Sequence, residues 1–340
     1  MSSATDILLV ADIGGTNTRV GLVEGATLQK ASIRRYRNAD YPGIEPVLRS
    51  YLADAGLAGC AGACVAAAGP VRDGVAELTN LDWTMSEASI GEAAGARVVA
   101  LLNDLQAPGY ALATLPPSSL RQIIAGPDAG DGGVQDGSRD GGRSGGRSGG
   151  RSGTRLVMNV GTGFNAVPVH TTKAGRVVPA SECGHVSLPV RHADELSLLA
   201  HIEAEHGFPS VEDVLSGRGL ELVDRWAGKG ASPRANTEIT AAALAGGDAR
   251  AAQAAGIFVR LMAVVAGNLA LTHLPFGGIY LTGGVVRHFA PHLIRFGFEA
   301  AYFDKGRFSA MMRDFPVWAI EDDYAPLHGC AAHLIEKLAG

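Results

Sequence analysis

The sequence predicts an α/β protein built from two related domains, and three observations lead to this class. The chain has 340 residues, which is enough for two domains with sizeable cores. Its first half alternates short apolar runs with helical patterns, as expected for parallel strands joined by crossover helices. A strand, a glycine turn and a second strand occur near the start and again from residue 155, which suggests two related domains facing each other.

The first expected turn carries groups suited to an anion. It follows the apolar run 7–10 and contains Asp12, Gly14, Gly15, Thr16 and Asn17. Two adjacent glycines let backbone N–H groups approach an anion without obstruction by Cβ, and the neighbouring hydroxyl and amide add donors. A phosphate with a hydrated Mg²⁺ beside it would suit this set. The alternative is an ordinary hairpin in which the glycines serve only the turn.

The elements that follow in the first half lead to two polar residues at a strand end. We expect elements at residues 27–33 (strand), 46–55 (helix), 64–68 (strand), 86–94 (helix capped by Ser86) and 98–102 (strand). The last strand delivers Asn103 and Asp104 at its C-terminal end, where open α/β sheets bind ligands. Asp104 is a candidate general base for the proton of an attacking hydroxyl. The alternative is a helix N-cap, a position that Asn and Asp favour.

Residues 126–153 interrupt the alternation with a repeat of Gly, Arg and Ser. The segment has almost no apolar residues and cannot bury a core, so we expect a flexible inserted loop. Its arginines could instead bind nucleic acid or an acidic partner. However, the repeat contains no aromatic residue for base stacking, which weakens that alternative.

The second half repeats the glycine turn and then becomes largely helical. Expected strands are 155–160, a segment ending at 169, 278–281 and 316–320, and expected helices are 192–206, 217–228, 238–245, 248–272 and 327–338. Glycine turns at Gly161-Thr162-Gly163 and Gly283-Gly284 join the first one as candidate contacts of a polyphosphate. The sequence has no Walker A motif and no Gly-x-Gly-x-x-Gly opening a helix after the first strand, which disfavours P-loop and Rossmann folds.

Three further polar residues, Glu182, His185 and Glu212, are candidate ligand contacts from loops. The spacing of the first two suits polar contacts to a ligand. A zinc site is the alternative, and it would need further ligands that the sequence does not reveal. For Glu212 the alternative is a place in the first turn of a helix.

The composition excludes several classes of protein. The formal net charge is −5, so no overall basic field attracts nucleic acid or a membrane. The four cysteines lack zinc-finger or thioredoxin spacing, which favours free thiols in a reducing compartment. The N-terminus has no basic region before its short apolar run, and no uninterrupted apolar stretch reaches about 18 residues. The cytoplasm is therefore the expected location.

Together these motifs resemble the bacterial glucokinase family of the actin/hexokinase/Hsp70-like ATPase superfamily. The resemblance covers nearly the whole chain except the insert. Besides the glycine turns, it rests on Leu78-Thr79-Asn80-Leu81-Asp82-Trp83, Leu102-Asn103-Asp104, Glu182-Cys183-Gly184-His185-Val186, Glu212-Asp213-Val214-Leu215-Ser216-Gly217, Leu281-Thr282-Gly283-Gly284 and Phe303-Asp304-Lys305-Gly306-Arg307-Phe308. The cysteine-rich zinc motif of the separate repressor/kinase sugar family is missing.

The resemblance implies a two-domain actin-like ATPase (ribonuclease H-like) fold with an interdomain cleft. The small domain would comprise residues 1–110 plus 321–340, and the large domain residues 111–320. The implied activity is ATP-dependent phosphorylation of D-glucose to D-glucose 6-phosphate, the first step of glycolysis, with Asp104 as the general base. The implied partners are D-glucose and MgATP, in a homodimer, with neither nucleic acid nor a membrane.

The resemblance also assigns the site residues. The sugar would be bound by Asn103, Asp104, Glu182, His185 and Glu212. ATP would be bound by Gly14, Gly15, Thr16, Asn17, Gly161, Thr162 and Gly163 at its phosphates and by Gly283 and Gly284 at its adenosine. Asp12 would hold Mg²⁺, through water. Polar groups suit the sugar because each buried hydroxyl needs a partner.

Two residues depart from the family pattern, Asn165 and Cys183, which stand where the family usually has glycine. Asn tolerates a left-handed backbone, so we expect Asn165 to keep the turn. Cys183 adds bulk beside the sugar loop, which could alter sugar affinity or choice. Two rival functions stay open: a non-catalytic sugar sensor on the same fold, and a kinase for another hexose or another phosphoryl donor such as polyphosphate.

Overall fold

The computed structural model describes residues 7–78, 81–127, 153–173 and 175–339. The predictions that concern residues 1–6, the Thr79-Asn80 part of one motif and most of the inserted loop (128–152) lie outside these described residues. The chain is mixed α/β, as predicted, and forms two compact units. The first unit comprises residues 1–116, 172–180 and 322–340, and the second comprises 117–171 and 181–321.

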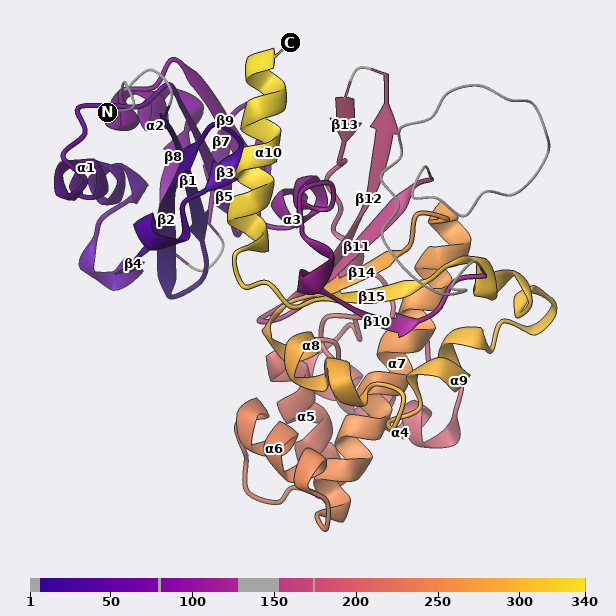
Figure 1. The fold of residues 1–340 in the computed structure, drawn as a ribbon. Coiled ribbons are helices and arrows are strands. Elements are labelled where there is room, and N and C mark those ends of the chain that lie inside the picture. Colours follow the sequence, from indigo (N-terminus) through magenta and orange to yellow (C-terminus); the bar gives the residue numbers. More distant parts are fainter. Residues whose placement is uncertain (1–6, 79–80, 128–152, 174, 340) are drawn as a thin grey trace, which may run out of the picture. The chain divides into compact units, whose positions relative to one another are not determined.

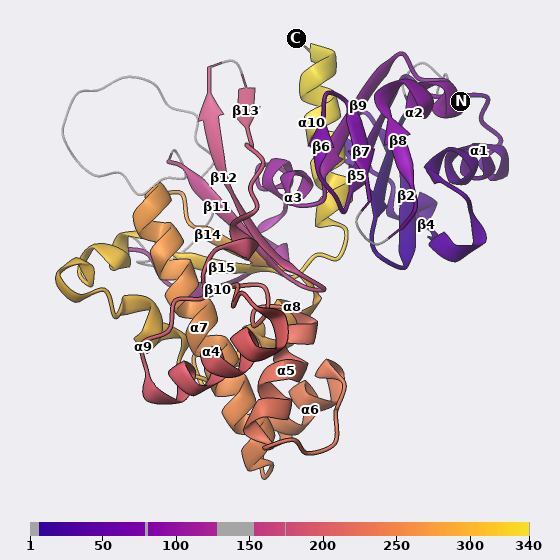
Figure 2. The same ribbon diagram turned by 180° about the vertical axis from the view of Figure 1, so that it is seen from behind.

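The first unit is built on a six-stranded sheet (Figure 1, Figure 2). The strand order is β3 (Thr27–Leu28), β2 (Asn17–Glu24), β1 (Ile7–Ile13), β5 (Gly62–Ala67) and β9 (Val98–Asn103), with β4 (Arg34–Arg37) also paired to β2. β1 and β2 form an antiparallel hairpin, whereas β1, β5 and β9 run parallel. The C-terminal ends of these three parallel strands therefore meet at one edge of the sheet.

Helices cover both faces of this sheet. One apolar cluster joins Leu9 and Ile13 of β1 to helices α1 (Ile44–Asp54) and α2 (Glu87–Ala94). The other face carries α10 (Ala325–Ala339), which packs on α3 (Gln106–Ala111) (Figure 1). Ser86 caps α2 as predicted, since its hydroxyl oxygen accepts the Ser89 N–H at 3.0 Å. A small separate antiparallel sheet contains β6 (Val71–Arg72), β7 (Val75–Glu77) and β8 (Thr84–Ser86).

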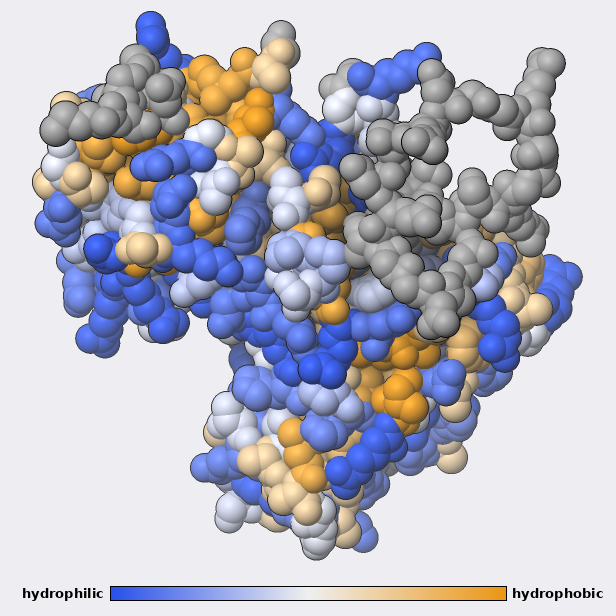
Figure 3. Space-filling view, in the orientation of Figure 1, coloured by the Kyte–Doolittle hydropathy of each residue, from blue (hydrophilic) through white to orange (hydrophobic). Residues whose placement is uncertain are grey.

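The predicted strand at 27–33 is wrong beyond Leu28, because β3 covers only Thr27–Leu28 and a 3₁₀ turn follows at Lys30–Ser32. Only Thr27–Leu28 pairs with the end of β2, and β4 pairs with its beginning. Between them Ser32 Oγ accepts the Leu22 N–H at 2.9 Å, a bond that the carbonyl of a continuous strand would otherwise make. β4 has three exposed arginines among its four residues, and the surface over it is hydrophilic (Figure 3). An edge strand of this composition has no apolar run by which to recognise it.

The second unit is built on a sheet whose strands come from distant parts of the chain (Figure 2). Their order is β10 (Leu120–Ile124), β15 (Val317–Ile320), β14 (Ile279–Thr282), β11 (Arg155–Val160) and β12 (Phe164–Thr172). β11, β14 and β15 run parallel, whereas β12 pairs antiparallel with β11. Its helices are α4 (Ala193–His206), α5 (Gly217–Ala227), α6 (Asn236–Ala245), α7 (Ala249–His273), α8 (Gly284–Phe289) and α9 (Phe298–Phe303). Short 3₁₀ turns occur in the first unit at Lys30–Ser32 and Asn38–Asp40. In the second unit they occur at Pro117–Ser119, Cys183–His185, Ala290–His292, Gly306–Phe308 and Met311–Asp314.

The segment 172–180 belongs to the first unit, whereas the predicted large domain included it. This segment contains β13 (Gly175–Val177). Arg176 Nε donates to Glu336 of α10 at 2.7 Å, and the Val178 carbonyl accepts a hydrogen bond from Gln106 Nε2 of α3, also at 2.7 Å. Side-chain bonds to residues distant in sequence therefore hold this segment.

Helix α7 is the central helix of the second unit's core. By length and composition it could cross a membrane, but 72% of its most apolar window is buried within the protein. The buried positions include Phe258, Leu261 and Met262, whose exposed fraction is 0%. Its apolar character is thus explained by packing within the fold.

Replacing Asp224 with Asn is expected to destabilise the second unit. Asp224 of α5 is fully buried, and its carboxylate pairs with both Arg234 and Arg250. Removing a carboxylate that partners two arginines should lower the free energy of unfolding by ~3–5 kcal/mol, as for other broken buried pairs. Urea unfolding measures the loss. Asp194→Asn, which removes a half-exposed partner of Arg260, should cost less than ~1 kcal/mol, and equal losses would contradict this account.

Candidate active site

The β1–β2 turn is fixed by the side chain of a buried asparagine, Asn38. The Gly14 N–H donates to the Asn17 carbonyl at 3.0 Å, and Asn38 Nδ2 donates to the Gly14 carbonyl at 2.7 Å. Asn38 is 2% exposed, and its Oδ1 accepts the Thr18 hydroxyl at 2.8 Å. No local sequence motif indicates this role, because Asn38 lies 20 residues after Thr18.

Gly15 of this turn leaves room for a ligand, whereas a Cβ added at Gly14 would lie 3.3 Å from the Asn17 carbonyl oxygen. Neither Gly14 nor Gly15 has a positive φ, so the backbone conformation does not by itself require glycine. A Cβ added at Gly15 would have no protein atom within 4 Å and would instead extend into open space. Thr16 beside it is exposed. At Gly15 this geometry favours close approach of a ligand over a purely conformational need for glycine.

Asp12 is a largely buried carboxylate next to this turn. Its side chain is 16% exposed, and Arg19 Nη1 lies 3.9 Å from Asp12 Oδ2. Burial raises the pKa of Asp12 to about 6, against a smaller lowering by Arg19. A hydrated divalent cation would offset this desolvation, and Mg²⁺ is usually bound by one or two carboxylates, waters and substrate phosphates. The residues present therefore fit Mg²⁺ held in that way.

A metal held by a protein cage has no comparable support. Within the described parts of the chain, no three His, Cys, Asp or Glu side chains gather so as to hold a metal ion. The zinc alternative for Glu182 and His185 therefore finds no further ligands there.

Asn103 and Asp104 lie at the same sheet edge as the β1–β2 turn. Ile13 pairs with Ala67, and Ala67 pairs with Asn103, so the three strand ends form one row. The Asp104 N–H donates to the Ala67 carbonyl at 2.9 Å. The first unit thus brings together the predicted base, one predicted sugar ligand and the first glycine turn.

The helix N-cap interpretation of Asp104 is wrong. Helix α3 has Leu105 as its N-cap, without a side-chain cap bond. Asn103 makes the local bonds instead: its Oδ1 accepts the Leu105 N–H at 2.9 Å, and its Nδ2 donates to the Gly69 carbonyl at 2.9 Å. An amide can make four such bonds, so Asn103 retains capacity for a ligand while these two fix its orientation.

In the second unit, Glu212 lies against the glycine turn between β11 and β12. The Phe164 N–H donates to Glu212 Oε2 at 2.7 Å. A Cβ added at Gly163 would lie 2.5 Å from the same oxygen, so glycine is needed for this close approach. The helix-turn interpretation of Glu212 is wrong, because α5 begins only at Gly217. The Gly217 N–H donates to the Gly161 carbonyl at 2.8 Å, which fixes the turn from its other side.

The loop bearing Glu182 and His185 is joined to the same place. The Glu212 N–H donates to the Gly184 carbonyl at 2.9 Å, and the His185 N–H donates to the Glu182 carbonyl at 3.1 Å. A Cβ added at Gly184 would lie 2.1 Å from the Phe164 carbonyl oxygen. Both the Glu182 and the His185 side chains are exposed and open to a ligand.

Gly283 and Gly284 complete this cluster. Gly283 has φ +105°, and a Cβ there would lie 2.4 Å from the Val160 carbonyl oxygen, so only glycine suits the position. The Gly284 nitrogen lies 3.8 Å from where a Cβ on Gly161 would stand. The second unit thus gathers two of the three predicted glycine turns with Glu182, His185 and Glu212. Thr162, at the middle of the first of these turns, is exposed.

The two departures from the family pattern contact each other. Asn165 lies in β12 without a positive φ, so the expectation that it keeps the turn by a left-handed backbone is wrong. Its Nδ2 donates to the Ser181 carbonyl, and its Oδ1 lies 3.4 Å from the Cys183 Sγ, within reach of the thiol hydrogen. Burial raises the pKa of the Cys183 thiol, which keeps it protonated as a donor. These contacts tie the loop of Glu182 to β12.

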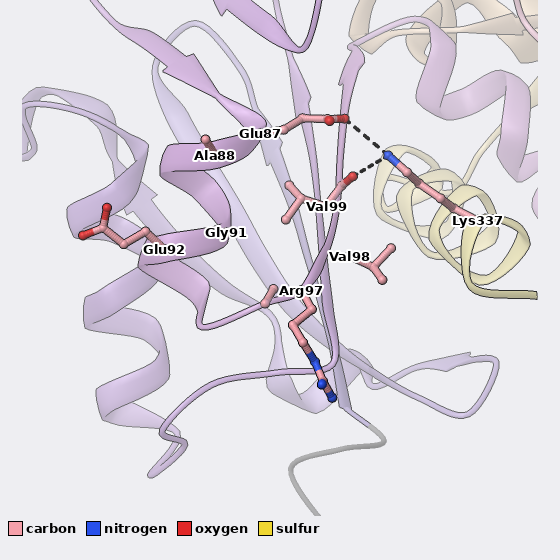
Figure 4. A pocket seen from close by; sticks show the side chains of 9 residues that line it. Glu87, Ala88, Gly91, Glu92, Arg97, Val98, Val99 and Lys337 are labelled. Atoms are coloured by element: carbon pink, nitrogen blue, oxygen red, sulfur yellow. Dashed lines mark hydrogen bonds and ion pairs between the residues drawn. The ribbon is translucent and has the colours of Figure 1, made fainter.

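A separate surface hollow of about 740 Å³ lies beside the edge strand β9 and holds none of the predicted site residues (Figure 4). Lys337 Nζ donates to the Val99 carbonyl at 2.6 Å and pairs with Glu87 at 3.5 Å. Glu87 Oε1 also accepts the Leu101 N–H at 3.3 Å. These side chains satisfy backbone groups that an edge strand would otherwise expose to pairing with another chain.

Comparison with known proteins identifies relatives along nearly the whole chain. The family model described as Glucokinase matches residues 9–337. A glucokinase of Chromobacterium violaceum is 33% identical over 97% of this chain and 90% of its own length. A glucokinase of Pseudomonas aeruginosa is 34% identical over 99% of this chain and 97% of its own length. The crystal structure of a glucokinase from an Antarctic psychrotroph superposes with a TM-score of 0.79 at 28% identity, covering 97% of this chain and 99% of that one.

Proposed function

Because the chain belongs to the glucokinase family and is an ATP-dependent glucose kinase, we propose that Asp104 is the general base of its reaction. The reaction converts ATP and D-glucose to ADP and D-glucose 6-phosphate, the first step of glycolysis, on the predicted actin-like ATPase fold. The glucose 6-hydroxyl oxygen attacks the γ-phosphorus, the bond from phosphorus to the ADP oxygen breaks, and Asp104 accepts the hydroxyl proton. The observation that carries this role is the place of Asp104 directly after β9, beside Asn103 and outside the helix cap.

We propose that the sugar hydroxyls are bound by the polar side chains of Asn103, Glu182, His185 and Glu212. Asn103 is oriented by its two backbone bonds, and Glu212 is oriented by the Phe164 N–H. The exposed Glu182 and His185 add a carboxylate acceptor and an imidazole from one short loop. A hydroxyl of inverted configuration would leave one of these groups without its partner, which would give selectivity for one hexose.

The nucleotide phosphates are bound by the two strand–turn–strand motifs, through Gly14, Gly15, Thr16, Asn17, Gly161, Thr162 and Gly163. Gly283 and Gly284 contact the adenosine. Asp12 would hold Mg²⁺ through water, and the ion, when bound, would neutralise charge on the phosphate oxygens. The open space at Gly15 and the desolvated Asp12 carboxylate support these assignments.

A coupled assay over several sugars and phosphoryl donors tests the activity. With purified full-length protein we expect D-glucose with MgATP to give the highest kcat/KM. A higher value with another hexose or with polyphosphate would replace this substrate assignment. Glucose binding without turnover would instead favour a sugar sensor. We also propose that the enzyme works in the cytoplasm and that it is a homodimer. Light scattering after size-exclusion chromatography tests the oligomeric state.

Replacing Gly184 with Ala should weaken glucose binding. The new Cβ would lie 2.1 Å from the Phe164 carbonyl, and backbone cannot yield as a flexible side chain does, so the loop of Glu182 and His185 must shift. A displacement of about 1 Å can cost ~10²-fold in activity, so we expect the KM for glucose to rise by at least ~10-fold. The control is Gly256→Ala in α7, where a Cβ meets no atom within 4 Å. An unchanged glucose KM in Gly184→Ala would contradict the role of this loop.

A further inference from the structure

We propose that Asp213 is a positioning residue for sugar binding, acting through Glu212 and the loop of Gly184. This proposal rests on the proposed function of Glu212 as a sugar ligand. Asp213 follows Glu212 directly in the chain, and its carboxylate is the centre of a small hydrogen-bonded cluster with Ser210 and His206.

The cluster closes the segment 206–213 upon itself. Asp213 Oδ2 accepts the Ser210 N–H at 2.8 Å and the Ser210 hydroxyl at 2.6 Å, and the Ser210 Oγ accepts the Asp213 N–H at 3.2 Å. Asp213 Oδ1 lies 2.7 Å from His206 Nδ1 at the end of α4. Ser210 is 6% exposed, so its hydroxyl depends on Asp213 rather than on water. The backbone that carries Glu212 is therefore held from both of its sides.

This segment also holds the neighbouring loop. The Val211 N–H donates to the Val186 carbonyl at 3.0 Å, and the Glu212 N–H donates to the Gly184 carbonyl at 2.9 Å. Ser210 itself pairs with Ser187 in an isolated β-bridge. A movement of residues 210–213 would thus displace both Glu212 and the loop bearing Glu182 and His185.

The carboxylate is ionised at neutral pH and suited to this task. Burial raises the pKa of Asp213, but hydrogen bonds from Ser210 and His206 outweigh it and hold the pKa below its ordinary value. An ionised carboxylate can accept at both oxygens, and here Oδ2 accepts both Ser210 donors while Oδ1 faces His206 Nδ1. Asn at this position would still accept from Ser210 through Oδ1 and could donate to His206 Nδ1. Alanine would remove both sets of bonds.

The test is steady-state kinetics of the full-length enzyme with glucose and MgATP. We expect Asp213→Ala to raise the KM for glucose about tenfold, because loss of buried hydrogen bonds displaces Glu212, with kcat and the KM for ATP changed less than about threefold. Asp213→Asn should recover most of the glucose affinity, and Ser210→Ala should fall between the two. A matched control is Glu205→Ala at the end of α4, next to His206. This variant removes the carboxylate of an exposed ion pair with Arg225 of α5 and should leave both KM values unchanged.

Glu212→Gln, measured in parallel, distinguishes a failure of the positioning role of Asp213 from a failure of the sugar assignment of Glu212. A raised glucose KM in Glu212→Gln with an unchanged one in Asp213→Ala would overturn the positioning role and leave the proposed function intact. An unchanged glucose KM in Glu212→Gln would overturn the sugar assignment itself. Equal increases in the KM for glucose and ATP in Asp213→Ala would indicate general loosening of the unit and would also overturn the proposal. If Asp213→Ala fails to fold, Ser210→Ala decides.

Discussion

Replacing Asp104 with Asn should lower kcat by at least ~10³-fold, which is within the range that general-base catalysis contributes. The carboxamide has nearly the size of the carboxylate and keeps an oxygen that can accept a hydrogen bond. However, it cannot take up the proton of the 6-hydroxyl at neutral pH. The backbone bond from the Asp104 N–H to the Ala67 carbonyl is unchanged by this substitution, and the carboxamide fits the same space, so we expect the local fold to persist.

The same variant should still bind glucose. Isothermal titration calorimetry should give a Kd within about threefold of the wild-type value, because the neutral amide loses only part of one hydrogen bond. Glu92→Gln is a matched control at an exposed acid of α2, with a side chain 82% exposed, and should retain full activity. An Asp104→Asn enzyme that turns over at near the wild-type rate would remove Asp104 as the base.

Replacing Asp12 with Asn should abolish most of the activity and yet stabilise the protein in the absence of nucleotide. Activity should fall by at least ~10²-fold, because stabilisation of phosphoryl-transfer charge by a metal ion is worth several kcal/mol. The apparent KM for Mg²⁺ should rise accordingly. Stability should increase, because burial raises the pKa of Asp12 to about 6 and the charged form is therefore unfavourable in the folded state.

The sign of this effect depends on pH. Because the folded-state pKa of Asp12, about 6, is above the ordinary pKa of 3.8, the folded protein binds more protons than the unfolded chain between these two pH values. The stabilising contribution of Asp12 to the free energy of unfolding is therefore fully present below about pH 4. It is lost as the pH rises through about 6. Urea unfolding should therefore show Asp12→Asn more stable by ~1–3 kcal/mol at pH 7, with little difference at pH 4. The control Asp54→Asn, at an exposed acid, should leave the free energy of unfolding unchanged at both pH values. A lower free energy of unfolding for Asp12→Asn than for the wild type at pH 7 would contradict this account.

The sequence predicts the two glycine-turn motifs because their signals are local. An apolar strand, glycines and a second strand follow one another within about 15 residues. For this reason the predicted strand 155–160 coincides with β11. The cap of α2 by Ser86 was predicted for the same reason, since a cap and its helix are adjacent in the chain.

Most of the omissions concern interactions between residues far apart in sequence. The N-cap of α3 is a local exception: it is Leu105, and the Leu105 N–H donates to Asn103 Oδ1, a choice that propensity does not reveal. Glu212 lies on the Phe164 N–H, 48 residues away. Asn38 holds the first turn across 20 residues. The Asp213 cluster had one local signal, the Ser-x-x-Asp spacing from Ser210, which resembles a capping motif without a helix after it.

Single-turnover rapid quench tests the central claim most directly, because it isolates the chemical step. Excess enzyme is mixed with radiolabelled MgATP and saturating glucose, and labelled sugar phosphate is measured over time. The wild-type enzyme should convert the bound ATP to glucose 6-phosphate in one rapid phase, and Asp104→Asn should form the same product at least ~10³-fold more slowly. Equal single-turnover rates would show that this carboxylate takes no part in the chemistry and would contradict the account.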